Sequence, residues 1–210
     1  MLALEGGNGV LDLFALTLRQ GESGLEAFAA LRNDGDAPAC HALLSLELYD
    51  KDQASLAVGT GGLLAAHFYR LVDGSNTIAA CVAPGDVTLA AVTGFPADLS
   101  LDQVGYAVYR CPYFALSATP ITGLSVDGVQ RVSNASGAAY TGTLVNGFDV
   151  GVKDPSVVVF SVNRAGRPLG AVTSSAALQI PPGGTWAFQT SSLSAPGVGQ
   201  SAYPEASLAN

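Results

Sequence analysis

The sequence is poor in charged side chains, and basic ones are the scarcest. Only 12% of its residues are charged, and lysine and histidine occur just twice each, as Lys51, Lys153, His41 and His67. Acidic residues outnumber basic ones by 17 to 9, which gives a net charge of −8. An acidic surface repels the phosphate backbone, and no basic amphipathic segment is present to bind anionic lipid. Composition therefore argues against nucleic-acid and membrane-surface partners.

Long apolar runs are also missing. No run approaches the roughly 18–20 apolar residues of a membrane-spanning helix, so we expect no membrane insertion. The first 18 residues are partly apolar, but Glu5 and Asp12 interrupt them and no basic segment precedes them. They do not form an intact signal peptide. Apolar residues still make up 49% of the 210 residues, enough to build one large domain or two small ones.

The residue pattern favours strands over helices. Alanine, valine and leucine dominate the apolar residues, and 25 glycines and 11 prolines punctuate the chain at short intervals. The longest expected strand is 39–49, in which alternate residues form one apolar face: Cys40, Ala42, Leu44, Leu46 and Leu48. The residues between them form a mixed face: His41, Leu43, Ser45, Glu47 and Tyr49. Because this combination is typical of a half-exposed sheet in a β-sandwich, we predict an all-β fold.

One stretch of the chain occurs twice. Residues 33–60 align without a gap with residues 146–173, so that Asn33 matches Asn146 and Thr60 matches Thr173 at an offset of 113 positions. The identities concentrate at expected turns. We predict two tandem β-sandwich units from an internal duplication, at 1–117 and 118–193. The Ser/Ala/Pro/Gly-rich residues 194–210 predict an extended or flexible tail.

The alignment also predicts an insert in the first unit. Pro84–Gly85 matches Pro182–Gly183 at an offset of 98, so the first unit carries about fifteen extra residues, at about 62–76. These residues combine aromatic area with polar groups, in His67, Phe68, Tyr69, Arg70 and Asp73. Because loops of sandwiches often carry function, they are the candidate binding residues. The alternative is that the aromatic residues extend a strand and cap the core or pack on the second unit.

Three cysteines permit one disulfide and one remaining thiol. Cys40 and Cys81 precede strands that we expect to be neighbours, and alternation turns Cys40 toward the core. We therefore predict a Cys40–Cys81 disulfide, with Cys111 as the odd thiol. The open alternatives are a Cys81–Cys111 bond and three reduced cysteines that serve as small buried side chains. The composition is typical of a secreted protein, which favours a disulfide.

Patterns of catalytic or metal-binding residues are weak. A Cys–His dyad could pair only Cys40 or Cys81 with His67, and no GxSxG occurs. The acidic turns around Asp34 and Asp50 are separated by a strand that would hold them roughly 30 Å apart, so they cannot form one site. Each turn alone has too few oxygen ligands for calcium. Glu47 shows no partner carboxylate for glycoside hydrolysis. We expect no catalytic residues, no metal and no cofactor.

The segment Leu46-Glu47-Leu48-Tyr49-Asp50 resembles the signature of the FxLYD family, with Leu in place of the leading Phe. Further matches are Asn33 after the first strands, a turn after Asp50 and Pro84–Gly85 before a late strand. The second unit keeps Asn163, Gly166 and Pro182–Gly183 but loses the Tyr-Asp pair. Family members are small immunoglobulin-like β-sandwiches of exported bacterial proteins. The resemblance implies two tandem immunoglobulin-like sandwiches, an extracytoplasmic location and no catalytic residues.

We therefore expect a non-enzymatic structural or adhesive module that is secreted, periplasmic or displayed at the cell surface. Its partner would be a protein or cell-surface component, or a second copy of the chain. An alternative is a carbohydrate- or peptide-binding module that uses the insert at 62–76. A third is a hydrolase whose site residues form no recognisable pattern.

Overall fold

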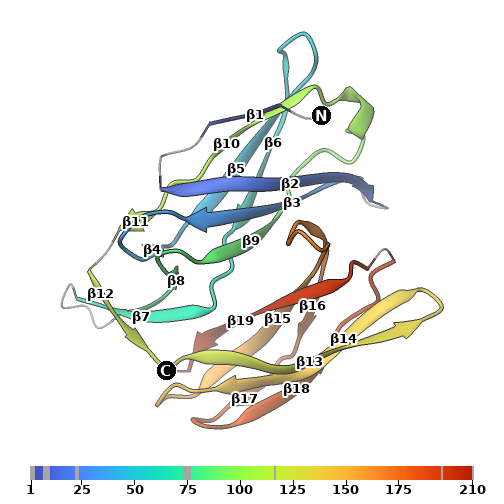
Figure 1. Ribbon diagram of the computed structural model, residues 1–210. Helices are drawn as coiled ribbons and strands as arrows, with labels where there is room; N and C mark the ends of the chain where they lie inside the picture. The colour runs from blue at the N-terminus through green and yellow to red at the C-terminus, as the bar shows by residue number, and fades with distance from the viewer. Residues whose placement is uncertain are drawn as a thin grey trace. The chain divides into compact units, whose positions relative to one another are not determined.

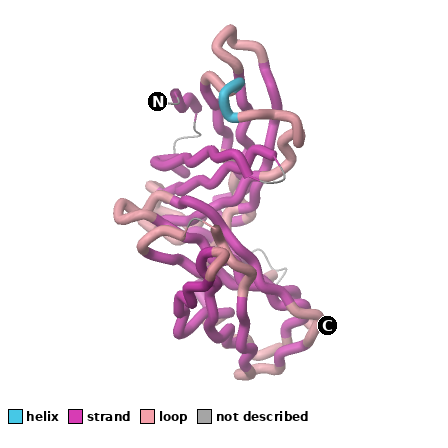
Figure 2. The backbone as a smooth tube through the Cα atoms, turned by 90° about the vertical axis from the view of Figure 1, so that its right-hand side faces the viewer, coloured by secondary structure: helices cyan, strands magenta, loops and turns pink. Residues whose placement is uncertain are grey.

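The computed structural model describes residues 3–6, 10–21, 24–72, 77–115, 117–194 and 196–209. These residues form an all-β structure, as predicted, in which one short 3-10 turn at Leu101–Gln103 accompanies the strands (Figure 1). Strands account for most of the backbone in both views (Figure 2). Small residues, frequent turns and alternating apolar positions favour this outcome over helices.

The chain divides into two compact units, and the division interrupts the sequence. Unit 1 comprises Met1–Leu63 and Cys81–Ser117, and unit 2 comprises Leu64–Ala80 and Ala118–Asn210. Most of the residues predicted as an insert in the first unit therefore belong to unit 2. The expected continuous boundary of 1–117 differs from this division because residues 64–80 pack with the second core.

Unit 1 is built from two main sheets, with strand orders β1-β10-β5-β6 and β2-β3-β9 (Figure 1). The first contains β1 (Ala3–Gly6), β10 (Tyr106–Arg110), β5 (Leu43–Tyr49) and β6 (Ser55–Gly62). The second contains β2 (Leu11–Gly21), β3 (Gly24–Asn33) and β9 (Val87–Val92). Short strands β4 (Ala39–Cys40) and β11 (Phe114–Ala115) pair with each other, and β4 also pairs with the end of β8 (Ile78–Val82). Leu44, Leu46 and Leu48 are fully buried in the core, which confirms the apolar face predicted for this strand.

Unit 2 repeats this plan. One sheet contains β13 (Leu124–Asn134), β14 (Gly137–Asn146) and β18 (Thr185–Gln189). The other contains β16 (Pro168–Ser175), β15 (Val152–Val162), β17 (Gln179–Ile180) and β19 (Gly199–Leu208). A further pair joins β7 (His67–Leu71) to β12 (Ala118–Ile121). Tyr140, Leu144 and Val159 are fully buried in its core.

The prediction of a flexible tail is wrong. Residues 199–208 form β19, which pairs with β15 from Gly199 opposite Val162 to Leu208 opposite Val152. Tyr203 is buried, and Ala202 packs against the core of unit 2. Serine, alanine and glycine dominate the composition of residues 194–210, so composition alone did not reveal a strand that pairs with β15 and buries Tyr203.

The strand pairs of the two units share one register. Pairs in β2–β3 and β5–β6 recur in β13–β14 and β15–β16 at an offset of 113, including a bulge after Leu48 and after Ser161. The pairs between β3 and β9 recur between β14 and β18, where the residues of β18 follow those of β9 at an offset of 98. The matching pairs include Leu11↔Asn33 with Leu124↔Asn146, Arg32↔Val87 with Val145↔Thr185, and Cys40↔Cys81 with Lys153↔Gln179. The sequence offsets therefore describe equivalent positions in the backbone.

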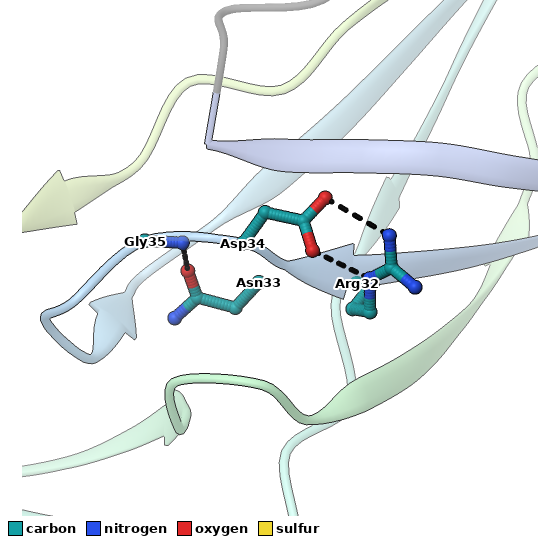
Figure 3. Close-up of polar contacts among 4 residues, drawn as sticks. All are labelled: Arg32, Asn33, Asp34 and Gly35. Carbon is teal, nitrogen blue, oxygen red and sulfur yellow. Dashed lines mark hydrogen bonds and ion pairs between the residues drawn. The ribbon is translucent and has the colours of Figure 1, made fainter.

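A fully buried asparagine ends β3 in unit 1 and β14 in unit 2. In unit 1, the Asn33 side-chain amide donates hydrogen bonds to the carbonyl oxygens of Ala37 and Val82, both at 2.9 Å. Its oxygen accepts a bond from the Gly35 amide at 3.0 Å, while Asp34 next to it points away to pair with Arg32 (Figure 3). One side chain thus satisfies backbone groups from two separate segments, which otherwise would be buried without partners.

Asn146 makes the equivalent bonds in unit 2. Its amide donates to Val150, Ile180 and Pro181 carbonyl oxygens at 2.9, 3.1 and 3.0 Å, and its oxygen accepts from the Phe148 amide at 3.0 Å. The main chains of both asparagines also bond to the turn that contains the Pro-Gly pair. The sequence places Asn33 next to the acidic turn around Asp34, and the structure shows that its side chain is an internal link.

A second shared turn joins β5 to β6 and β15 to β16. The Asp50 carboxylate accepts bonds from the amides of Asp52 and Ala54, both at 2.8 Å. Asn163 accepts from the equivalent amides in unit 2 at 2.9 and 3.0 Å. The next-to-last position of each turn has a positive φ, 68° at Gln53 and 74° at Gly166. Unit 1 therefore places a side chain where unit 2 uses glycine.

Replacing either buried asparagine should destabilise its unit strongly. We expect Asn33→Ala or Asn146→Ala to lower the free energy of unfolding by about 2–4 kcal/mol, because several buried carbonyls and one amide lose their partner. Calorimetry measures the loss. The control Asp34→Ala, at an exposed ion pair, should cost less than about 1 kcal/mol. An equal, small effect for all three variants would contradict the structural role.

The Asp50 turn offers a stabilising substitution. Gln53→Gly should raise the free energy of unfolding by about 0.5–1 kcal/mol, because relief of a left-handed conformation exceeds the entropy cost of glycine. The reverse change, Gly166→Gln, should lower it by a similar amount. Chemical denaturation of both variants checks the pair, and a destabilising Gln53→Gly would show that the side chain makes a favourable contact instead.

Candidate functional site

The predicted disulfide between Cys40 and Cys81 is present. The two cysteines face each other in the paired strands β4 and β8, with Cα atoms 4.2 Å apart, and both are buried. The alternative bond between Cys81 and Cys111 is therefore wrong. A Cys–His dyad with His67 is excluded as well, because neither bonded cysteine offers a thiol. The disulfide indicates an oxidising environment.

Cys111 keeps its thiol inside the core of unit 1. Its surroundings are apolar, and burial raises its pKa to about 12. A thiol with so high a pKa stays protonated at neutral pH, so it is a poor nucleophile and a poor metal ligand. In this setting Cys111 packs as a small apolar side chain.

The insert forms strand β7, and its aromatic residues take part in packing. Phe68 lies edge-on to Phe148, with ring centroids 5.2 Å apart, and also closely approaches Gly123, where an added Cβ would lie 2.3 Å from the ring. Tyr69 is buried, Arg70 is half-buried and His67 is exposed. Asp73 lies outside the described residues. This arrangement leaves the binding role of His67, Phe68, Tyr69 and Arg70 a prediction, and it favours the packing alternative for the two rings.

The remaining candidates do not converge. Asp50 caps its own turn, and His41 is exposed at a break in the long strand, where its φ is 50°. Asp154, the equivalent residue in unit 2, has a φ of 49°, so this conformation belongs to the shared backbone. Within the described residues, no group of three or more His, Cys, Asp or Glu could hold a metal ion.

Polar and aromatic side chains meet on the outward face of three strands in unit 1. We call this surface the tyrosine face. Strand pairing arranges it in three rows: Tyr106, Tyr49 and Ser55; Val108, Glu47 and Val58; and Arg110, Ser45 and Thr60. All nine are exposed or half-exposed, whereas Leu46 and Leu48 between them point into the core.

The two tyrosines stack across neighbouring strands. Their ring centroids lie 4.9 Å apart and their planes differ by 5°. Such a separation is close to the spacing of adjacent strands, so each ring stands over its own strand. Because the pair restricts both side chains, the tyrosine face presents a rigid aromatic surface at one end.

Glu47 lies at the centre of this face and is held from two sides. Ser55 Oγ donates a hydrogen bond to Glu47 Oε1 at 2.8 Å. A hydrogen bond to the Glu47 carboxylate raises the pKa of Tyr49, because the phenol donates to it and resists ionisation. The carboxylate therefore has a fixed position and still has lone pairs available for a ligand.

The equivalent surface of unit 2 has a different chemistry. Glu47, Tyr49 and Ser45 correspond to Phe160, Val162 and Val158, and the register places Tyr203 at the position of Arg110. Phe160 is fully buried and lies edge-on to Tyr203, with centroids 6.1 Å apart. A common backbone thus carries a polar, aromatic face in one unit and an apolar one in the other.

Sequence reasoning recognised three of the nine residues of the tyrosine face. Alternation placed Ser45, Glu47 and Tyr49 on the mixed face of the long strand. It could not find Tyr106 and Arg110, because their strand lies more than fifty residues away and only pairing brings it alongside. The available signal was the alternation in Tyr106-Ala107-Val108-Tyr109-Arg110. It would have placed Tyr106 and Arg110 on this face only if the strand next to residues 43–49 had also been predicted.

No protein-family model and no curated protein matches the chain. In the described part of the chain, no helix has the length and hydropathy that a membrane span requires.

Loss of the disulfide should destabilise unit 1. The bond closes a loop with a sequence separation of 41. We expect Cys40→Ala/Cys81→Ala to lower the free energy of unfolding by about 3–4 kcal/mol, since the unfolded chain regains loop entropy. Denaturation with and without reductant measures this effect. Reductant should leave the double variant unchanged, and a wild-type protein equally insensitive to reductant would contradict the prediction.

The Cys111 thiol should resist alkylation in the native state. We expect iodoacetamide at pH 8 to leave the folded protein unmodified and to add one group after unfolding in guanidinium, as read by intact mass. The reason is that burial limits access and the raised pKa suppresses the thiolate. Rapid labelling of the folded protein would show that Cys111 is accessible.

Proposed function

We propose that this chain is an exported, non-enzymatic module that acts through surface contacts. It consists of two tandem immunoglobulin-like sandwiches from an internal duplication, related to the FxLYD pattern. The shared register and the two buried asparagines support the duplication, because independent folds would not repeat bonds at constant offsets. The disulfide supports an extracytoplasmic location.

The contrast between the exposed tyrosine face of unit 1 and the equivalent face of unit 2, where Phe160 and Tyr203 are buried, carries the functional proposal. Both sheets use the same strands and register, so the fold itself does not require Tyr49, Glu47 and Arg110 on one of them. Exposed polar groups in fixed positions beside aromatic rings are typical of recognition surfaces. We assign the surface contact to the tyrosine face, and its partner is a component of a bacterial cell surface.

The FxLYD-like residues then divide into structural and exposed groups. Leu46 and Leu48 build the core, and Asp50 caps the turn. Tyr49 and Glu47 stand on the outside of the sheet. For the alternative of a carbohydrate- or peptide-binding module, we propose the tyrosine face as the binding surface in place of the insert. Phe68 of the insert packs against Phe148, whereas Tyr49 is half-exposed.

Immobilised protein should retain bacterial envelope fragments through the tyrosine face. We expect Glu47→Ala/Tyr49→Ala to reduce retention at least tenfold in biolayer interferometry, since it removes the central carboxylate and one ring. The matched variant Val162→Ala, at the position of Tyr49 in unit 2, should bind like the wild type.

Calorimetry of both variants establishes that they are folded. Equal retention by the wild type and the double variant would exclude the tyrosine face as the contact. Absence of retention by the wild type would contradict the proposed partner.

A further inference from the structure

We infer that the tyrosine face binds a neutral saccharide, with the Tyr49 ring as a stacking surface and the Glu47 carboxylate as an acceptor for sugar hydroxyls. This inference rests on the proposed function, which it makes specific by naming the chemistry of the partner.

The Tyr49 ring is half-exposed. Tyr106 stacks on one side of it, over β10. The opposite side faces β6, the edge strand of the sheet, where the paired residue is the small Ser55. The Tyr49 ring thus rises beside the lower surface over Ser55, and the face of the ring forms the wall of this step. The C–H face of a pyranose can stack on such a wall and remove apolar area from water without an enclosed pocket.

Polar groups stand where the hydroxyls of a stacked sugar would lie. The Cα atoms of Glu47 and Tyr49, two residues apart on one strand, lie about 7 Å from each other, and the Tyr49 phenol donates a hydrogen bond to the carboxylate. Its carboxylate is held by Ser55 at 2.8 Å, so binding does not require it to be ordered first. Arg110 and Ser45 add donors in the last row. Acceptor and donors thus flank one aromatic wall.

Charge and shape distinguish this ligand from others. A net charge of −8 and a central carboxylate oppose polyanions such as nucleic acid or sulfated glycans. An open face suits an extended chain of sugars better than a small molecule, which needs most of its surface enclosed. A peptide would pair with the edge of β6, but a reciprocal bridge between Thr60 and Thr93, at 2.9 and 3.0 Å, occupies part of that edge.

Affinity electrophoresis tests the inference with defined probes. Native gels that contain hydroxyethyl cellulose or yeast mannan should retard the wild-type protein in at least one case, and gels with dextran sulfate should not. Tyr49→Ala should abolish the retardation, Tyr49→Phe should preserve most of it because the ring remains, and Glu47→Gln should weaken it. Val162→Ala is the matched control and should behave like the wild type.

Three outcomes would overturn the inference: no retardation by either neutral polysaccharide, equal retardation of wild type and Tyr49→Ala, or stronger retardation by dextran sulfate. Periodate oxidation of the envelope fragments separates this inference from the proposed function. Retention that needs the tyrosine face but survives oxidation of the sugars would leave the surface role intact and show that the partner is not a saccharide.

Discussion

Each unit depends on one buried asparagine side chain that links the end of a strand to backbone from two other segments. Asn33 satisfies carbonyls at Ala37 and Val82, and Asn146 satisfies their counterparts at Val150 and Ile180. A leucine could fill the same volume, but it would leave the carbonyls in the buried bonds, those of Val82 and Ile180, without a partner. The amide is therefore a structural requirement of the repeated unit. Its neighbour Asp34 shows the contrast, because it is exposed and its carboxylate pairs with the exposed Arg32 side chain (Figure 3).

The two units protect their sheet edges differently. In unit 1 the N-terminal strand β1 pairs in parallel with β10. In unit 2, a two-residue irregularity in β13 between Asp127 and Gln130 accompanies hydrogen bonds that join β13 to the β19 region, from Gln200 to Val129 and from Arg131 to Gly197. Both arrangements cover backbone that would otherwise invite pairing with another chain. Core, turns and edges therefore do not depend on the second face of these sheets. The side chains on this face of β5 and β10 differ from those at the equivalent positions of β15 and β19.

Local patterns predicted the parts of the structure that depend on nearby residues. Alternation placed Leu44, Leu46 and Leu48 in the core, and strand neighbourhood predicted the Cys40–Cys81 bond. The same reasoning failed where the structure depends on pairing between strands that are far apart in the sequence. Residues 199–208 are mostly small or polar and were expected to form part of an extended or flexible tail, yet backbone bonds to β15 make them a strand. The sequence did not reveal the internal role of Asn33, because its partner Val82 is 49 positions away. Tyr106 reaches Tyr49 only through the register of the sheet.

The most direct test of the shared asparagine link is hydrogen exchange of the side-chain amides, resolved by NMR in the native protein. We expect the NH₂ groups of Asn33 and Asn146 to exchange slowly and at similar rates, since both donate to buried carbonyls at 2.9–3.1 Å. The exposed Asn134, which donates to Ser192, provides the internal reference. Exchange at Asn33 or Asn146 as fast as at Asn134 would contradict the link on which both units are built.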